Sequence, residues 1–208
     1  MAWREKVTEQ TRTMGFFDLV RAGTSQSVQA AISNGADVNA RNSYDKTPLM
    51  YAAMYNQNPE VITALLAAGA DIKARDKYGR SPLMAAARDN QNPEVITTLL
   101  KAGADLMVQD KYGRSPLMAA AEYNQNPEVI TALLAAGADI KVRDKYGRSP
   151  LMAAARDNQN PEAIAILLKA GADGKAKSSA GKTAFDYAQG NAKLKGTDAY
   201  RKLQEASK

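Results

Sequence analysis

The chain of 208 residues contains no cysteine and no histidine. Without cysteine there can be no disulfide bond, and the redox compartment of the protein is left open. The two absences together exclude the usual zinc ligands and any nucleophile–base pair built on cysteine or histidine. A glycine-rich phosphate loop and a metal-binding cluster are missing as well. We therefore expect no cofactor and no metal, and only an Asp/Glu pair is left as a possible acid and base.

Long hydrophobic runs are also missing. No apolar stretch approaches the ~18 residues that a membrane span needs, so we expect no association with a membrane. The first residues, MAWREKVTEQ, are too polar for a signal peptide, although a secreted or periplasmic chain with its leader removed would look the same. A cytoplasmic location is the default expectation.

What the chain does contain is a repeat. The stretch Asp76–Gln109, DKYGRSPLMAAARDNQNPEVITTLLKAGADLMVQ, returns almost unchanged 34 residues later as Asp110–Arg143. Glycines recur at the same spacing at Gly35, Gly69, Gly103, Gly137 and Gly171, and prolines at Pro48, Pro82, Pro116 and Pro150. A fixed period of this length predicts a solenoid, in which each unit buries its apolar face against its neighbours.

Each unit begins with a turn and a first helix. Residues 76–80 predict a turn in which Gly79 takes a positive φ. Ser81 is expected to cap a helix that starts at Pro82 and runs to about Asp89. Asn90 suits a left-handed residue that stops the helix.

A second helix follows in the same unit. Asn92, Pro93 and Glu94 form its start signal, since they combine a cap, a first-turn proline and an acid favoured by the helix dipole. An apolar stripe at helical spacing then follows: Val95, Ile96, Leu99 and Leu100. Gly103 ends this helix, and Ala104 to Gln109 is predicted to run extended into the next turn.

The pattern resembles the ankyrin repeat family. The resemblance rests on TPLM at Thr47–Met50 and on SPLM beginning at Ser81, Ser115 and Ser149. It also rests on the alanine pairs that follow, on the Leu-Leu of each second helix and on the repeated GAD. It implies an all-α solenoid of turn–helix–helix units that stack with a right-handed twist and project β-turn fingers. Two departures stand out, because methionine (Met50, Met84, Met118, Met152) replaces the family's histidine and the turn between the helices is one residue longer.

The repeat divides the chain into segments. Residues 1–13 are a polar lead-in or an extra helix, and 14–41 form a degenerate capping repeat. Four full repeats follow at 42–75, 76–109, 110–143 and 144–177, and 178–208 form a C-terminal capping repeat with a final helix near Asp198–Ala206. Tyr55–Glu94 and Tyr123–Glu162 differ only at Ala74 versus Val142, which indicates duplication of a two-repeat unit. Near-identical repeats could also mark an engineered or consensus scaffold, but the irregular ends and Asp45, where other turns have glycine, favour a natural origin.

The resemblance also implies a binding face. In the family, partners usually dock on the concave side, which is built from turn tips and exposed positions of the first helix. The matching turn positions here are Tyr44, Lys46, Lys77, Tyr78, Arg80, Lys111, Tyr112, Arg114, Lys145, Tyr146 and Arg148. The matching helix positions are Tyr51, Met54, Tyr55, Arg88, Asp89, Glu122, Tyr123, Arg156 and Asp157.

Several columns of this face have more than one interpretation. The tyrosine column could anchor a partner or pack on the neighbouring turn. The lysine and arginine columns could attract an acidic protein or a nucleic-acid backbone, or form a solvated edge. The methionine column is expected to pack between helices. The net charge of +6 permits nucleic-acid binding, but acids lie among the basic residues, which argues against a phosphate-tracking surface.

We therefore expect a non-enzymatic, monomeric module that binds another protein on its concave face. The alternative is a protein that binds nucleic acid or another polyanion through its basic turn tips.

Overall fold

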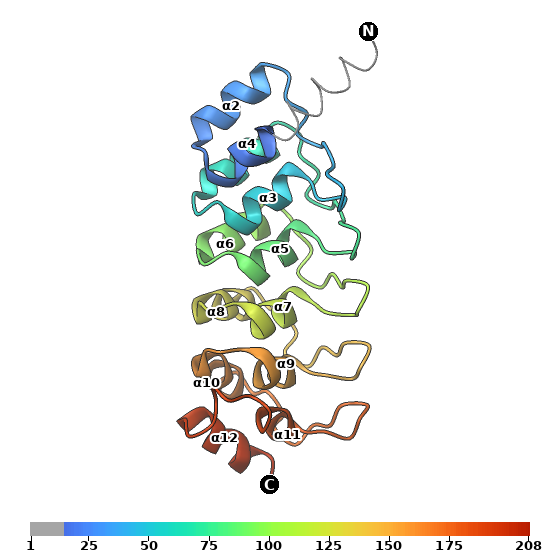
Figure 1. The fold of residues 1–208 in the computed structure, drawn as a ribbon, viewed down its shortest axis with the longest axis vertical. Coiled ribbons are helices and arrows are strands. Elements are labelled where there is room, and N and C mark those ends of the chain that lie inside the picture. Colours follow the sequence, from blue (N-terminus) through green and yellow to red (C-terminus); the bar gives the residue numbers. More distant parts are fainter. Residues whose placement is uncertain (1–14) are drawn as a thin grey trace.

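The computed structural model describes residues 15–208, and in that part every regular element is a helix. The segment expected to be a lead-in or an extra helix, residues 1–13, lies outside the described residues. The helices stack in pairs into one elongated column, with the N-terminal and C-terminal units at opposite ends (Figure 1). The predicted all-α solenoid is confirmed.

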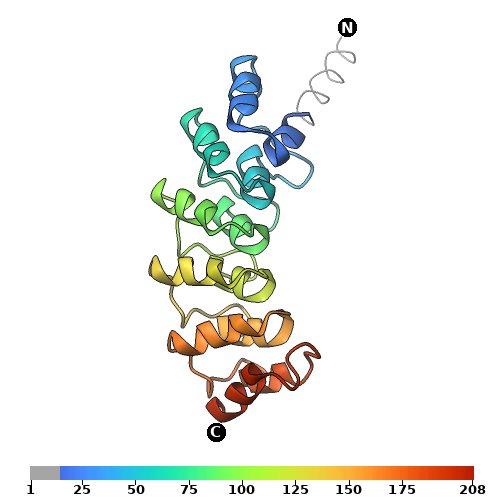
Figure 2. The same ribbon diagram turned by 90° about the vertical axis from the view of Figure 1, so that its left-hand side faces the viewer.

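The helices form two layers. The inner layer consists of helical residues 15–22, α3 (Pro48–Tyr55), α5 (Pro82–Asp89), α7 (Pro116–Tyr123), α9 (Pro150–Asp157) and α11 (Ala184–Ala188). The outer layer consists of α2 (Ser25–Ser33), α4 (Pro59–Ala67), α6 (Pro93–Lys101), α8 (Pro127–Ala135), α10 (Pro161–Lys169) and α12 (Asp198–Ala206). From α2 to α12, each helix packs on the same-layer helix of the adjacent unit or units. The inner layer borders a row of loops that project from one side of the column (Figure 1), and the helix pairs stack one above another along it (Figure 2).

The ends of the helices follow the predicted capping signals. The Ser81 side chain accepts a hydrogen bond from the Met84 backbone, and Asn92 caps α6 in the same way by accepting from Glu94. At the other end of α6, Gly103 has φ +90°, which favours glycine. The helix predicted from Pro82 to about Asp89 is observed as α5.

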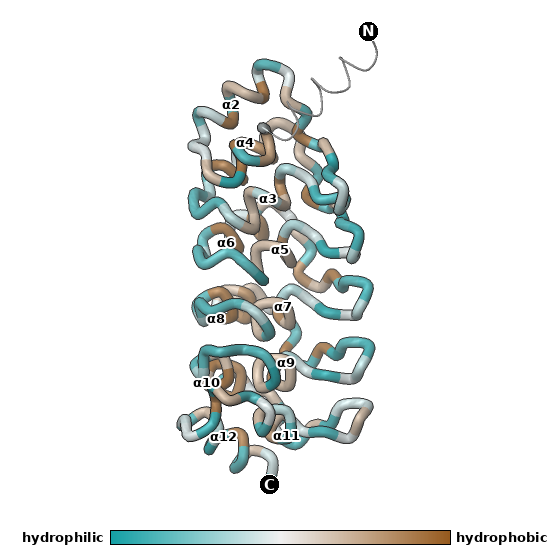
Figure 3. Tube along the Cα trace, viewed as in Figure 1, coloured by the Kyte–Doolittle hydropathy of each residue, from teal (hydrophilic) through white to brown (hydrophobic). Residues whose placement is uncertain are grey.

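The core runs between the layers along the whole column. Val95, Ile96 and Leu99 are fully buried, as the stripe predicts, whereas Leu100 is only half-buried. The methionine column is buried as expected, with at most 1% of any of these side chains exposed: Met50, Met84, Met118 and Met152. Hydrophobic residues accordingly gather on the helices, and hydrophilic residues on the projecting loops (Figure 3).

Asparagine, rather than a left-handed turn, stops the inner helices. Asn90 has φ −80° and ψ 134°, an extended conformation, so the predicted left-handed stop at this residue is wrong. Its buried amide donates to the carbonyls of Ala53 and Asn56 in the preceding unit, both at 2.9 Å. The side-chain oxygen of Asn90 accepts from the Asn92 backbone at 2.8 Å.

The same bonds recur along the column. Asn56, Asn90, Asn124, Asn158 and Asn191 each donate to two carbonyls of the preceding unit, and together they form the asparagine ladder. The acceptors lie at or just beyond the C-terminal ends of inner helices, where carbonyls lack partners within the helix. The ladder therefore satisfies buried backbone groups and joins each unit to the next.

The segment that returns from one unit to the next is not extended throughout. A turn forms at Leu106 and Met107, where the Asp105 side chain accepts from the Met107 backbone at 2.9 Å. The prediction of an extended Ala104–Gln109 is therefore wrong in its middle. Within residues 15–208, none of the helices combines the length and the hydrophobicity needed to cross a bilayer.

Candidate functional site

Each projecting loop is a finger, and an aspartate closes three of the five. Five fingers occupy residues 42–46, 76–80, 110–114, 144–148 and 178–182, and their first and last residues are joined by a backbone hydrogen bond. In the second finger, Asp76 accepts from the backbones of Tyr78 and Arg80, both at 2.9 Å. Gly79 has φ +76°, as predicted, and a Cβ there would lie 3.2 Å from the backbone nitrogen of Lys111 in the next finger. The tight turn and the close neighbour thus both require glycine.

A backbone ladder connects the fingers. The amides of Lys77, Lys111, Lys145 and Ser179 donate to the carbonyls of Tyr44, Tyr78, Tyr112 and Tyr146 in the preceding fingers, at 2.9–3.0 Å. The fingers therefore form a continuous row, and the positions of their side chains are set by the backbone.

The arginines of the fingers are internally paired. Arg80, Arg114 and Arg148 each form an ion pair of 2.6–2.8 Å with the aspartate at the start of the same finger. At most 17% of any of these three side chains is exposed. Each guanidinium also lies 4.8–5.1 Å from the ring centroid of the tyrosine two residues earlier. The finger arginines are thus neutralised and largely covered, so they do not form a solvated edge.

The outer surface of the fingers is left to lysine and tyrosine. Lys77, Lys111 and Lys145 are exposed, and so are the tyrosines beside them. The exposed fraction is 55% for Tyr44, 41% for Tyr78, 42% for Tyr112 and 56% for Tyr146. The rings of Tyr78, Tyr112 and Tyr146 pack on the arginine of their own finger and still present area to solvent.

The strip of surface where the inner helices meet the row of fingers is termed the groove, and the inner helices form its floor. The N-terminal end of the groove is aromatic. Tyr51 contacts Phe17 and Tyr55 edge to face, with ring centroids 4.9 and 5.7 Å apart. Arg21 lies 5.0 Å from the ring centroid of Tyr55. Met54 is buried, so it supports this cluster instead of facing a partner.

Lys46 joins the aromatic end to the charged part of the floor. Its ammonium group lies 5.8 Å from the Tyr51 ring centroid. Burial and then the nearby Arg80 lower the pKa of Lys46. Burial likewise raises the pKa of Asp89, although Arg88 and Lys46 act in the opposite direction.

A buried acid lies at the centre of the floor. Glu122 is only 2% exposed and lies 2.9 Å from Arg156 and 3.5 Å from Arg114. Burial raises the pKa of Glu122, and the two arginines offset part of this effect. Because Glu122 is covered by its own arginines, it organises the floor and is not free to meet a partner directly.

The remaining floor residues are accessible. Arg88 lies 4.6 Å from the ring centroid of Tyr123, which is 37% exposed. Arg156 forms a second ion pair of 2.5 Å with Asp157, and both are exposed. The structure thus brings the predicted helix positions together in one strip, within which Met54 and Glu122 are buried; among the finger positions, Arg148 is buried as well.

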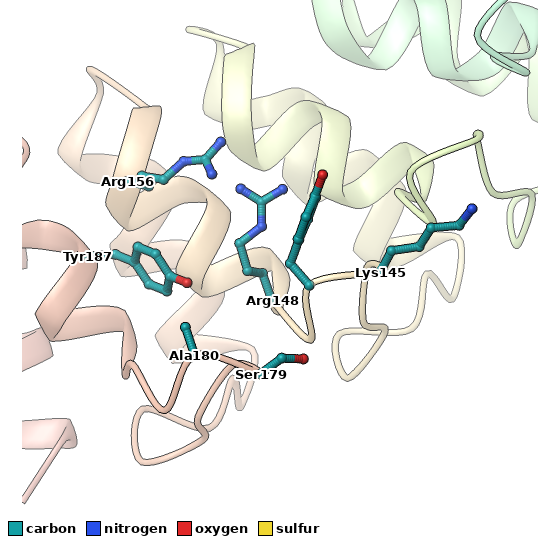
Figure 4. A pocket seen from close by; sticks show the side chains of 7 residues that line it. Lys145, Arg148, Arg156, Ser179, Ala180 and Tyr187 are labelled. Atoms are coloured by element: carbon teal, nitrogen blue, oxygen red, sulfur yellow. The ribbon is translucent and has the colours of Figure 1, made fainter.

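A pocket of about 450 Å³ lies at the C-terminal end of the groove (Figure 4). It is lined by Lys145, Tyr146, Arg148, Arg156, Ser179, Ala180 and Tyr187. Ser179, Ala180 and Tyr187 were not among the predicted site residues. Ser179 and Ala180 lie 34 residues after Lys145 and Tyr146, and Tyr187 lies four periods after Tyr51, so the same columns, continued into the capping repeat, lead to all three.

The chemistry of the face is that of recognition. Among residues 15–208, no group of three acidic side chains is placed to hold a metal ion. Most of the polar side chains described above are paired with one another. What the face offers outward is aromatic area, lysine charge and the exposed ion pairs of the floor.

Comparison with models of protein families gives one match. A model described as ankyrin repeats (three copies) matches residues 16–110, 58–144, 83–178 and 117–196, so the matches together extend from residue 16 to residue 196. No curated protein matches the chain.

Proposed function

The chain belongs to the ankyrin repeat family, whose repeats generally serve in protein–protein interaction, and we propose that it binds a partner protein in the groove between its fingers and inner helices. The proposal gives the chain no catalytic role, which is typical of the family.

One observation carries this proposal. Within residues 15–208, seven large hydrophobic side chains are exposed, and six of them are tyrosines of the fingers or the groove floor: Tyr44, Tyr55, Tyr78, Tyr112, Tyr123 and Tyr146. Only Met107 lies elsewhere. Exposed aromatic area gathered on one face is typical of interaction sites, and tyrosine is enriched among residues that dominate binding energy.

The backbone ladder supports the same proposal. Because each finger is hydrogen-bonded to the next, the tyrosines are held at a regular spacing before a partner arrives. A preorganised surface loses little conformational entropy on binding, so more of the contact energy is available as affinity.

The alternative of a polyanion partner has weaker support. The paired arginines leave the lysine column as the outward charge of the fingers. Acids lie on the same face, including Asp89 and Asp157. A nucleic-acid backbone normally meets a surface of one sign.

A cross-linking experiment tests the proposal. A photoreactive phenylalanine analogue is placed at Tyr112, in the fingers, and at Thr131, an exposed position of α8 in the outer layer of the same unit. We expect a defined protein to be cross-linked in source cells from position 112 and not from position 131. Equal capture from both positions, or capture of nucleic acid alone from position 112, would overturn the proposal.

A double variant gives the energetic test. Arg88→Ala with Tyr123→Ala should lower the affinity for the captured partner at least tenfold, because the double variant lacks an accessible aromatic ring and the cation packed on it. Thr131→Ala is the control. An unchanged affinity, measured by calorimetry on variants that melt like the parent protein, would place the site elsewhere.

A further inference from the structure

The pocket at the C-terminal end of the groove has a one-sided charge. Three of its lining residues are cations, Lys145, Arg148 and Arg156, and three others carry hydroxyl groups, Tyr146, Ser179 and Tyr187. No acidic side chain of the described residues lines it. Arg148 lies between Arg156 and Lys145, and Tyr187, Ala180 and Ser179 border the opposite side (Figure 4).

One donor of Arg148 has no partner. Only 5% of this residue is exposed, and its Nη1 is buried without a hydrogen bond within the described structure. Its Nε and Nη2 are both used by Asp144, at 2.6 Å. A buried guanidinium nitrogen without an acceptor is costly, and native structures seldom leave one.

The preceding repeat shows what is missing. Arg114 occupies the equivalent position 34 residues earlier, and its Nη1 lies 3.5 Å from Glu122 and 3.4 Å from the hydroxyl of Tyr123. In the repeat of Arg148, the residue that matches Glu122 is Arg156. A carboxylate in one repeat is thus replaced by a second cation in the next.

The acids near the pocket are each paired with an arginine, although Oε2 of Glu122, 3.5 Å from Nη1 of Arg114, is buried without a hydrogen bond. Asp144 is bound to Arg148, and Glu122 and Asp157 are bound to Arg156. Lys145 forms no ion pair with any described residue and is exposed at the rim. The pocket therefore has unused positive charge and an unused buried donor, and both are complementary to an anion.

We propose that this pocket binds the carboxylate of a glutamate or aspartate in an acidic segment of the partner protein. The carboxylate would lie near Nη1 of Arg148 as the Glu122 carboxylate lies near Nη1 of Arg114, with Lys145 and Arg156 beside it. The pocket volume of about 450 Å³ admits an acidic side chain together with part of its backbone. The inference rests on the proposed function, since it names the chemistry of a partner for the same groove.

Titration with peptides, followed by ¹H–¹⁵N correlation spectra of the full chain, tests this inference. The probes are a capped peptide with three glutamates, the same peptide with three glutamines, and a ten-residue oligothymidylate. We expect saturable shifts with the glutamate peptide, confined to fingers 144–148 and 178–182. Shifts of equal size in all five fingers, equal binding of the glutamine peptide, or tighter binding of oligothymidylate at the pocket would overturn the inference.

Matched variants sharpen the result. Lys145→Gln should lower the affinity for the glutamate peptide at least threefold. Lys111→Gln, at the same finger position one unit earlier, should leave this affinity unchanged. Both lysines are exposed, so both variants are expected to keep the parent's melting temperature. Equal effects of the two substitutions would indicate a diffuse lysine edge and refute a pocket.

The outcome is separable from that of the proposed function. If a protein cross-linked from position 112 binds Lys145→Gln as tightly as the parent and does not compete with the glutamate peptide, the pocket inference fails and the proposed function stands. If the peptide binds as expected but no protein is captured from the groove, the proposed function fails and the pocket is an anion site of another kind.

Discussion

Removing one member of the asparagine ladder should destabilise the column far more than removing its polar neighbour. Asn124 is 1% exposed and makes three hydrogen bonds. Its amide donates to Ala87 at 2.9 Å and to Asn90 at 2.8 Å, and its oxygen accepts from the Asn126 backbone at 2.8 Å. Asn124→Ala leaves two carbonyls and one amide without these partners.

The magnitude follows from the bond count. A typical intramolecular hydrogen bond contributes about 0.5–1.5 kcal/mol, and a buried group left without a partner costs about 1–3 kcal/mol. With two carbonyls and one amide left without these partners, the free energy of unfolding should fall by about 3–5 kcal/mol. Gln125, the next residue, is exposed, and Gln125→Ala should change stability by less than about 0.5 kcal/mol.

Urea unfolding followed by far-ultraviolet circular dichroism measures both variants. Because repeat arrays can lose cooperativity when one interface weakens, the slope of the transition is compared along with its midpoint. A loss below about 1 kcal/mol for Asn124→Ala, or a loss equal to that of Gln125→Ala, would refute the view that the ladder holds the units together.

Three further predictions concern single positions. Leu99→Ala, which deletes a fully buried side chain, should cost ~2–5 kcal/mol in chemical unfolding, and an unchanged midpoint would contradict our placement of the core. Asp45 is the only described non-glycine residue with positive φ, at 57°, so Asp45→Gly should stabilise the protein by about 0.5–1 kcal/mol in a thermal melt, whereas Gly113→Ala should destabilise it. Burial raises the pKa of Glu122, so its contribution to stability is present at low pH and is lost as the pH rises through its folded pKa. As the pH is lowered from 7 to 4, the free energy of unfolding of the parent should therefore increase relative to that of Glu122→Gln. A difference that does not change with pH would contradict the raised pKa of Glu122.

The repeat pattern predicted the fold because every unit carries local start and stop signals. Ser81, Asn92 and Gly103 act where their side chains or backbone conformations predict. The role of Asn90 was missed because asparagine suits both a left-handed stop and an extended residue. Its amide bonds to carbonyls 37 and 34 residues away, and no local propensity reports such a partner.

The positions of the candidate site residues could be predicted from the repeat columns, but the pairing of their charges was not predicted. The exposed tyrosines lie at the positions that the family resemblance implied. The state of Arg80 could have been inferred from Asp76, since the acid recurs four residues before the arginine in three fingers. The pocket could not be inferred, because it depends on how the irregular C-terminal repeat meets the last regular one.

The asparagine ladder has a consequence for how such a chain can change its length. Each rung joins one unit to the next through nearly the same pair of carbonyls, so a unit placed anywhere in the row finds matching connections above and below it. Insertion or deletion of the 68-residue pair that separates Tyr55 from Tyr123 would leave every remaining joint intact. The groove could thus be lengthened or shortened by whole two-repeat units. Such a change would alter the distance between its aromatic end and its basic end without altering the residues of either end.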